Sequence, residues 1–249
     1  MRLHDLIFLI VDTETTGLDP AEDQVVELGA ATVRNDRVEP VFHSLVNPGI
    51  PIPPEKSAIH GIADWHVADK SPLDVEWHRF EPLVESADCL VAHHASFDRS
   101  FLPHVEGKPW LDTKRFAQHL WPYAPNHRNQ TLRYWKGLRL NSAAHSADGD
   151  ALVTAHLLVL MIRDYLAQGH PDSLEGLISY AESPIFVNKM PFPLHENNIS
   201  EIDIHAVPHD YLRWVLANVL VGVNLTPDLK WSIESVLKGG DNRDRSTGA

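Results

Sequence analysis

The sequence predicts an α/β layer fold with a mixed sheet, followed by a smaller C-terminal unit. Three apolar segments near the N-terminus have the composition of strands, and the segments after them alternate between strand and amphipathic helix. That order is typical of helices packed on a mixed sheet. The chain has 249 residues, 43% of them hydrophobic, which is enough for one large core and a small appendage.

Four strands are predicted in the first half of the chain. Residues 6–12 form an apolar run, and residues 24–34 and 37–46 have strand composition, with Asn35 and Asp36 as a hairpin turn between them. Residues 47–54 contain four prolines and are expected to be extended or turn-like. The fourth strand covers residues 89–93 and includes Cys89, the single cysteine.

Helices are predicted where apolar residues recur at intervals of three and four. In the first unit these segments are residues 72–85, 112–121, 131–137 and 148–167. Glycine and proline punctuate the chain from residue 169, which predicts a first domain over 1–168 and a linker over 169–187. A second module over 188–238 contains predicted helices at 210–219 and 227–237, and the tail 239–249 is expected to be disordered.

Composition excludes several classes of protein. One cysteine cannot form an internal disulfide framework and fits a reducing compartment. No secretory signal and no membrane-spanning segment is visible, so a cytoplasmic location without membrane contact is predicted. The net charge of −13 argues against non-specific binding of nucleic acid through a basic surface, although bound cations can reverse the local charge.

Two carboxylates lie side by side at the end of the first strand. In VDTETTG (residues 11–17), Asp12 and Glu14 are two positions apart, so a strand points both side chains to the same face. Anions this close raise each other's pKa or recruit a cation. Taken alone, this motif has an alternative to cation binding, namely an exposed strand end whose two acids are solvated.

Two further motifs place ionisable side chains at predicted helix starts. In HHASFD (residues 93–98), Asp98 follows the fourth strand, and in HSADGD (residues 145–150), His145 and Asp150 flank the start of the longest helix. Taken alone, each motif is explained by helix capping or by charges that complement the helix dipole. Four converging carboxylates, however, are untenable without metal. Hard oxygen ligands with no thiolates indicate Mg²⁺ or Mn²⁺.

These three motifs, in this order, resemble those of the DEDDh branch of the DnaQ-like 3′–5′ exonucleases over residues 5–167. The resemblance implies a ribonuclease-H-like sheet flanked by helices and metal-dependent hydrolysis of phosphodiester bonds. It further implies that Asp12, Glu14 and Asp150 hold one metal ion, and that Asp12, with Asp98 through water, holds a second. His145 is then the general base that takes a proton from the attacking water. Histidine suits this role because it can accept a proton near neutral pH.

The resemblance also implies a pocket for the terminal nucleotide. Thr15, Thr16 and Gly17 are expected to approach the nucleotide through their backbone, where glycine leaves the most room. Leu18 is expected to wedge against the last base. A plain core leucine is the alternative for this position.

Three more residues belong to the predicted substrate site. His60 matches a family position that lines the nucleotide pocket, with a helix-end histidine as the alternative, and His93 and Phe97 of the second motif complete the set. The family usually has asparagine where this chain has His94. That departure puts substrate placement in doubt more than chemistry, because no metal ligand changes.

Within the family the chain most resembles the exodeoxyribonuclease X group, on stretches such as residues 92–99 (AHHASFDR). The second unit resembles the C-terminal module of that group over residues 207–214 (VPHDYLRW), but a lysine-containing turn of the module is replaced at residues 192–198. Tyr211, Leu212 and Trp214 are either core residues at helical spacing or a stacking surface for a base.

The implied substrate is single-stranded DNA or a DNA 3′ end, with release of nucleoside monophosphates in DNA repair or end processing. An RNA-trimming exonuclease and a polymerase proofreading subunit are the alternatives within the fold. A non-catalytic nucleic-acid-binding protein is the alternative from another class. The intact acids and His145 argue against this last alternative.

Overall fold

The structure, a computed structural model, describes residues 2–102, 107–142, 144–191, 202–220 and 225–244. It divides the chain into two compact units, Met1–Glu182 and Ser183–Ala249. Each unit has its own cluster of buried hydrophobic residues.

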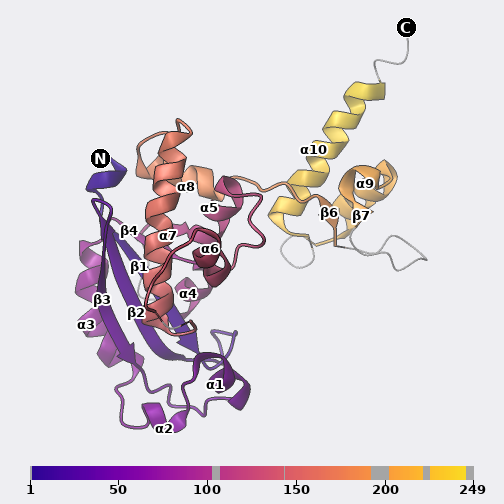
Figure 1. Cartoon of the computed structure of the whole chain (residues 1–249). Coiled ribbons are helices and arrows are strands. Elements are labelled where there is room, and N and C mark those ends of the chain that lie inside the picture. The colour runs from indigo at the N-terminus through magenta and orange to yellow at the C-terminus, as the bar shows by residue number, and fades with distance from the viewer. Residues whose placement is uncertain (1, 103–106, 143, 192–201, 221–224, 245–249) are drawn as a thin grey trace. The chain divides into compact units, whose positions relative to one another are not determined.

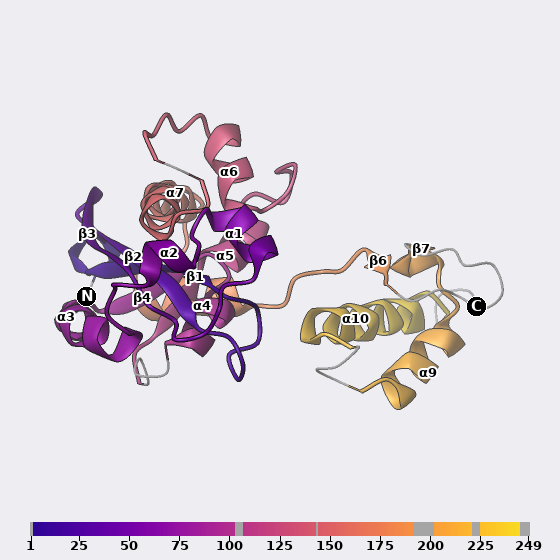
Figure 2. The ribbon, with the colours of Figure 1, turned by 90° about the horizontal axis from the view of Figure 1, so that it is seen from below.

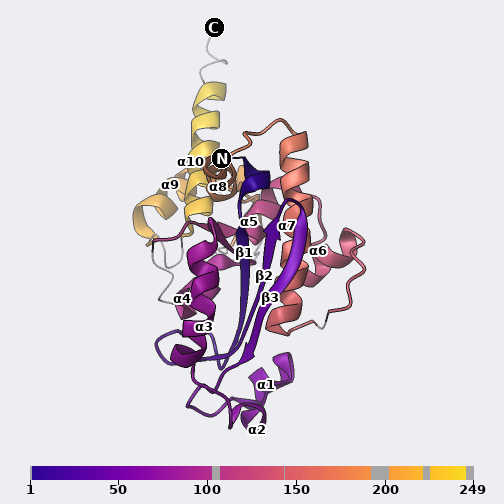
Figure 3. The same ribbon diagram turned by 90° about the vertical axis from the view of Figure 1, so that its left-hand side faces the viewer.

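A five-stranded sheet forms the centre of the first unit (Figure 1, Figure 3). The strands are β1 (Phe8–Thr15), β2 (Val25–Arg34), β3 (Arg37–Leu45), β4 (Cys89–Ala92) and β5 (Trp110–Asp112). Their order is β3-β2-β1-β4-β5, with antiparallel pairing among β1, β2 and β3 and parallel pairing among β1, β4 and β5. The predicted mixed sheet is therefore confirmed. The short β5 was not predicted.

The predicted hairpin between β2 and β3 is also present. Asn35 and Asp36 have positive φ angles of 53° and 58°, a conformation that Asn and Asp tolerate better than most residues. The hairpin sets the antiparallel register of β2 against β3, in which Arg34 pairs with Arg37.

Helices cover both faces of the sheet (Figure 2). The longest, α7 (Ala147–Ala167), lies against β1, β2 and β3, and α3 (Leu73–Ser86) covers the opposite face. The other helical segments of this unit are η1 (Leu3–Asp5), α1 (Pro54–His60), α2 (Asp64–Val67), α4 (Ala95–Phe101), α5 (Thr113–Leu120), α6 (Asn129–Trp135) and α8 (Leu174–Glu182).

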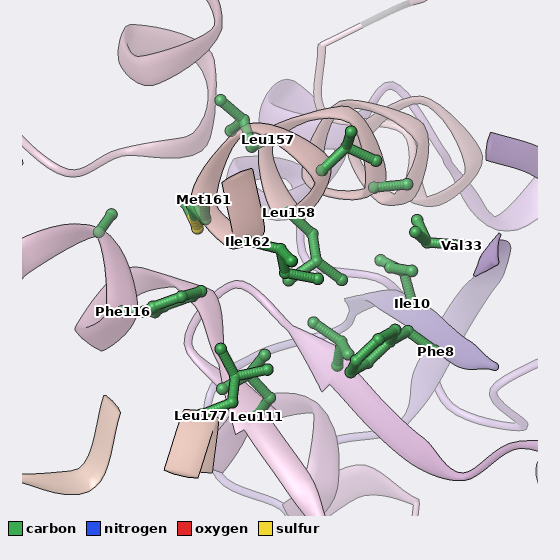
Figure 4. Close-up of a cluster of buried hydrophobic side chains, with 14 of the residues drawn as sticks. Phe8, Ile10, Val33, Leu111, Phe116, Leu157, Leu158, Met161, Ile162 and Leu177 are labelled. Carbon is green, nitrogen blue, oxygen red and sulfur yellow. The ribbon is translucent and has the colours of Figure 1, made fainter. Parts of the chain in front are cut away.

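Alternation along β1 assigns its side chains to two cores. Phe8 and Ile10 pack into the cluster shared with α7, which Figure 4 shows. Leu9 and Val11 pack into the cluster shared with α3. Because successive side chains of a strand point to opposite faces, the residues after Val11 must continue this alternation. The hydrophobic pattern of β1 therefore fixes which helix each following side chain faces.

The boundary between the units lies later than the sequence predicts. Residues 169–187 were expected to be a linker, but α8 belongs to the first unit and buries Leu177 and Ala181 in the same cluster as α7. His170 stacks on Tyr165 of α7, with ring centroids 4.7 Å apart. Apolar burial of α8 is the physical reason for the difference.

The second unit contains a two-stranded sheet and two longer helices. Its elements are β6 (Lys189–Met190), β7 (Ile202–Asp203), η3 (Ile204–Ala206), α9 (His209–Asn218) and α10 (Pro227–Asp244). Helix α10 continues into the segment 239–249, which was predicted to be disordered, whereas the altered turn at 192–198 lies outside the described residues. Leu212 is a core residue, but Trp214 is 52% exposed and stacks on Tyr211.

Candidate metal centre and active site

The register of β1 turns the acids of the first motif toward α7. Asp12 and Glu14 continue the alternation of Phe8 and Ile10, whose side chains pack against that helix. Thr13, between the two acids, is oriented toward the other face. The helix that covers the strand therefore determines which further side chains can reach Asp12 and Glu14.

Three carboxylates meet at the end of β1. Oxygen atoms of Asp12, Glu14 and Asp150 all lie within 4.8 Å of one another. Asp150 comes from the first turn of α7, more than a hundred residues away in sequence. A set made only of carboxylate oxygens has the chemistry that Mg²⁺ and Mn²⁺ prefer.

Helix α4 brings the fourth predicted acid to the same place. The Oδ1 atom of Asp98 accepts hydrogen bonds from the backbone N–H and the hydroxyl of Thr13, both at 2.9 Å. Burial raises the pKa of Asp12 and of Glu14, and the charge of Asp98 adds to the rise in both. Asp98 thus lies beside the three-carboxylate cluster, bound to the strand residue between its first two members.

The cluster is electrostatically costly without a cation. Burial, followed by repulsion from the neighbouring carboxylates, raises the pKa of Glu14 to about 8 and holds the pKa of Asp12 well above its ordinary value. Burial also raises the pKa of Asp98 to about 7, against the opposing effect of its hydrogen bonds from Thr13. Divalent cations favour the ionised forms and would reverse these shifts. The donor set therefore fits a metal.

Asp150 is oriented from two sides. The side-chain amide of Gln130, in α6, donates to its Oδ1, and the backbone N–H of His145 donates to its Oδ2 at 3.0 Å. Burial raises the pKa of Asp150, and these hydrogen bonds oppose the rise. His145 itself is exposed, has a φ of 59°, and borders a cavity of about 500 Å³ together with Asp150. The predicted base lies beside the acids.

The segment after Glu14 is held by internal hydrogen bonds. The hydroxyl of Thr15 donates to the carbonyl of Gly17, and the hydroxyl of Thr16 donates to Asp23 at 2.9 Å. A Cβ on Gly17 would lie 2.1 Å from a carboxylate oxygen of Asp23. The close approach of Asp23 is therefore a reason for glycine here that the sequence did not reveal.

Leu18 and His60 flank this strand end. Leu18 is 73% exposed, which excludes the alternative of a core leucine. His60 ends α1, where its Nδ1 accepts from the N–H of Ile62 at 3.1 Å. Burial lowers the pKa of His60, and the adjacent backbone of Thr15 acts in the opposite direction. His60 is thus a helix-end residue that also borders the end of β1.

His93 and Phe97 have structural partners. The ring nitrogens of His93 lie 3.0 Å from the hydroxyl of Thr113 and 2.8 Å from the carbonyl oxygen of His127. Burial lowers the pKa of His93 to about 4. The ring of Phe97 packs on Phe101, with centroids 5.0 Å apart. These contacts hold both side chains in place, and direct binding of substrate by either residue stays a prediction.

The unusual His94 occupies a left-handed backbone position. Its φ is 86°, it precedes α4, and its N–H donates to Asp112 at 3.2 Å. Asn, Asp and His are the non-glycine residues enriched in this conformation. The left-handed position therefore suits a histidine, and the exposed imidazole of His94 lies on the wall of the 500 Å³ cavity.

Two residues of β2 contact the first residue of α7 and allow the helix to pack closely on the strand. Neither was predicted from the sequence. Glu27 is 4% exposed, and its Oε2 accepts from the N–H of Ala147 at 2.8 Å. A Cβ on Gly29 would lie 2.2 Å from the backbone of Ala147. In the strand register Glu27 is opposite Glu14, and Gly29 is opposite Asp12. The available signal was an acid and a glycine two positions apart within residues 25–31, which are otherwise apolar.

Glu27 also belongs to a second group of potential ligands, with His43 and Asp148. The Nε2 atom of His43 lies 2.7 Å from Oε1 of Glu27, so both carboxylate oxygens of Glu27 have protein partners. His43 and Asp148 are exposed. We therefore assign this group to the docking of α7 on the sheet.

The exonuclease family RNase_T matches residues 9–158, a range that contains all four acids and His145. The chain therefore belongs to this family of nucleases, and its first unit has the ribonuclease-H-like exonuclease fold of the DnaQ-like members. None of the helices in the described parts of the chain combines the length and apolarity needed to cross a membrane.

Curated relatives include two polymerase-associated proteins. One relative is a DNA polymerase III subunit epsilon-like protein of Rhodobacter capsulatus, to which the chain is 36% identical over 178 residues. The aligned residues cover 67% of this chain and 25% of the relative. The chain is 32% identical over 201 residues to a PolC-type DNA polymerase III of Listeria monocytogenes, covering 77% of this chain and 14% of that one. The chain thus spans a quarter or less of the length of these relatives.

Solved structures give the same fold. An exonuclease X in complex with 5′ overhanging duplex DNA is 30% identical, with a TM-score of 0.56, over 70% of this chain and 99% of that one. An E. coli exonuclease I in complex with a dT13 oligonucleotide has a TM-score of 0.59 over 90% of this chain and 62% of its own. Its 17% identity makes it similar in fold alone.

Proposed function

We propose that the chain is a metal-dependent 3′–5′ exonuclease that hydrolyses phosphodiester bonds at DNA 3′ ends and releases nucleoside monophosphates. The observation that carries the proposal is the meeting of Asp12, Glu14 and Asp150 within 4.8 Å, with Asp98 beside them. A structural protein gains nothing from four buried or half-buried acids in one place, since their repulsion and desolvation oppose folding.

The arrangement supports the ligand roles that we propose. Asp12, Glu14 and Asp150 would hold one Mg²⁺ ion, and Asp12, with Asp98 through water, would hold a second, with Mn²⁺ as a substitute. When bound, a pair of such ions supplies positive charge that stabilises both the attacking and the leaving oxygen of an in-line displacement at phosphorus. Thr13 and Gln130 hold Asp98 and Asp150 in place through the hydrogen bonds described above.

His145 is the proposed general base. It adjoins Asp150 in space, it is exposed to the cavity, and its own backbone N–H orients that carboxylate. An imidazole at this place can take the proton of the attacking water, while the 3′ oxygen of the preceding nucleotide leaves. The same residue thus contributes its backbone to the acid cluster and its side chain to proton transfer.

The terminal nucleotide is proposed to bind beside the end of β1. Leu18, exposed at the strand end, offers an apolar surface to the last base, and His60 lies on the neighbouring helix end. Thr15, Thr16 and Gly17 fix the turn between them and offer backbone groups. Loops on a rigid sheet are the usual place for such contacts.

DNA is the proposed substrate class because relatives and neighbours act on or bind it. The curated relatives are DNA polymerase III proteins, and the solved exonuclease X structure, at 30% identity, is a complex with 5′ overhanging duplex DNA. Proofreading within a polymerase assembly and trimming of RNA are the two other activities that the same chemistry permits. They are outcomes of the test below.

The test uses purified chain with 5′-labelled single-stranded DNA, duplex DNA and RNA, each with Mg²⁺ and with chelator. We expect a ladder of products shortened from the 3′ end with DNA and Mg²⁺, and no cleavage with chelator. Asp12→Asn should abolish the ladder while circular dichroism stays unchanged. Full activity in chelator, or in the Asp12→Asn variant, would refute the proposal, and faster shortening of RNA would reassign the substrate.

A further inference from the structure

A cavity of about 500 Å³ adjoins the acid cluster on the side of Asp150. Its wall is built from the end of β4, the start of α5, the segment that enters α6 and the segment that enters α7. Besides His145 and Asp150, which the catalytic chemistry described above uses directly, the lining includes His93, Lys114, Arg128 and Gln130.

The charge of this cavity is opposite to that of the acid cluster. Lys114 and Arg128 both line it, and Asp150 is the single acid on its wall. Within the part of the chain that the structure describes, neither cation forms an ion pair. In a chain of net charge −13, these two cations are therefore available to an anionic group bound in the cavity.

The cavity is also rigidly connected to the acids. The amide of Asn129 donates to the backbone carbonyl of Asp150 and to the hydroxyl of Thr154, and Gln130 donates to the carboxylate of Asp150. On the far wall, His93 lies within hydrogen-bonding distance of the carbonyl of His127. A group bound in the cavity is therefore held at a fixed position relative to Asp150.

We infer that this cavity receives the phosphates of the nucleic-acid strand on the 5′ side of the bond that is cut, with Lys114 and Arg128 as their counter-charges. The inference rests on the proposed function and names the path of the substrate through that site. The strand is a polyanion, and the carboxylates repel each phosphate beyond the one that is hydrolysed. The terminal nucleotide is assigned to the end of β1, so the rest of the strand needs another wall, and this one carries the cations.

Binding of phosphates in this cavity would not depend on the base sequence. Contacts with phosphates fix the position of a strand but carry no information about its bases. Lys114 and Arg128 should therefore strengthen the binding of any strand with at least one phosphate beyond the scissile one. They should contribute nothing specific to a small ester that has no such phosphate.

The test compares Lys114→Gln and Arg128→Gln with the control Arg37→Gln in the full chain. Arg37 is an exposed cation at the start of β3, so its variant changes the net charge equally. The substrates are a 5′-labelled thymidine oligonucleotide and the p-nitrophenyl ester of thymidine 5′-monophosphate. Kinetics are measured at several salt concentrations.

Each cavity variant should raise KM for the oligonucleotide roughly two- to fivefold, which is the range expected for one solvent-exposed charge interaction. The slope of log KM against log salt should fall by about 0.7 for each phosphate that the variant no longer neutralises. The ratio of oligonucleotide to ester kcat/KM should fall in these variants and stay constant in Arg37→Gln. If cavity and control variants have the same KM and salt slope, or if both substrates are affected equally, the inference is wrong. Wild-type chain that cleaves neither substrate would instead refute the proposed function.

Discussion

At the scale of single residues, the acid cluster links metal binding to stability. Glu14 has its pKa raised to about 8 from an ordinary value of 4.5, so the folded chain binds this proton more tightly than the unfolded chain does. The stabilisation from this proton is complete below about pH 4.5 and is lost as the pH rises through 8. The metal-free fold should therefore lose stability across this range, and bound cation should restore it.

The first prediction follows for Glu14→Gln, which cannot ionise. In chelator its melting temperature should differ little from wild type at pH 5 and exceed it at pH 8.5, because the repulsion among the acids is reduced. Scanning fluorimetry at both pH values measures this, with Glu39→Gln, on an exposed position of β3, as the control. A melting-temperature difference that is the same at both pH values would contradict the electrostatic account of the cluster.

A second prediction concerns His145. Its left-handed φ of 59° favours asparagine as the replacement, because asparagine tolerates this conformation and keeps the N–H that orients Asp150. His145→Asn should lower kcat by roughly 10²–10⁴-fold, the usual contribution of a positioned acid–base group. Mn²⁺ affinity should change little. His78→Asn, at an exposed position of α3, is the control; a full rate in His145→Asn would exclude the proposed base.

At the scale of elements, the site depends on how closely α7 approaches β2. Gly29 permits the backbone of Ala147 to pass where any Cβ would be 2.2 Å away. The carboxylate of Glu27 satisfies the buried N–H at that point. Together they place Asp150, one turn further along, beside Asp12 and Glu14.

The third prediction is that Gly29→Ala pushes α7 away from the sheet. Overpacking of this kind costs about 1–3 kcal/mol of unfolding free energy, and the displaced Asp150 should lower metal affinity and cleavage together. Gly239→Ala is the control, since a Cβ there meets no atom and glycine in a helix is unfavourable. Denaturant unfolding measures the stability of each variant. A Gly29→Ala variant as stable and active as wild type would show that this contact does not determine the position of α7.

Sequence reasoning predicted four strands of the main sheet, the long helices and the acids because each leaves a local pattern. Period-two alternation implied that Asp12 and Glu14 share a face, and helix starts marked Asp98 and Asp150 as candidates. The contact of Glu27 and Gly29 with Ala147 was not predicted, because α7 is far from β2 in the sequence. The pattern of a strand does not show which helix covers that strand. The same limitation hid the basic cavity, whose walls come from four separate segments.

At the scale of the whole molecule, the two units have separate cores, and every proposed catalytic residue lies in the first. The boundary at residue 182 changes where the chain can be shortened. Helix α8 buries Leu177 and Ala181 against the first unit, and His170 stacks on Tyr165. Removing α8 and His170 exposes apolar surface of α5 and α7.

The fourth prediction compares two shortened chains. Residues 1–182 should fold cooperatively and keep a saturated cleavage rate on short single strands close to that of the whole chain. Residues 1–168, which end before α8, should unfold at a lower temperature. Circular dichroism melts and single-strand cleavage assays measure both. A collapsed saturated rate in a folded 1–182 chain would show that the second unit helps to build the active site.

The most direct test of the central claim is Mn²⁺ binding measured by the electron paramagnetic resonance signal of the free ion. The wild-type chain should bind two ions saturably, and Asp150→Asn should weaken binding by about tenfold or more. Asp148→Asn is the matched control, because Asp148 lies in the same turn of α7 but belongs to the group around Glu27. It should bind as the wild type does. Absence of saturable binding in the wild type, or equal losses in both variants, would contradict the assignment of Asp12, Glu14 and Asp150 as the metal centre.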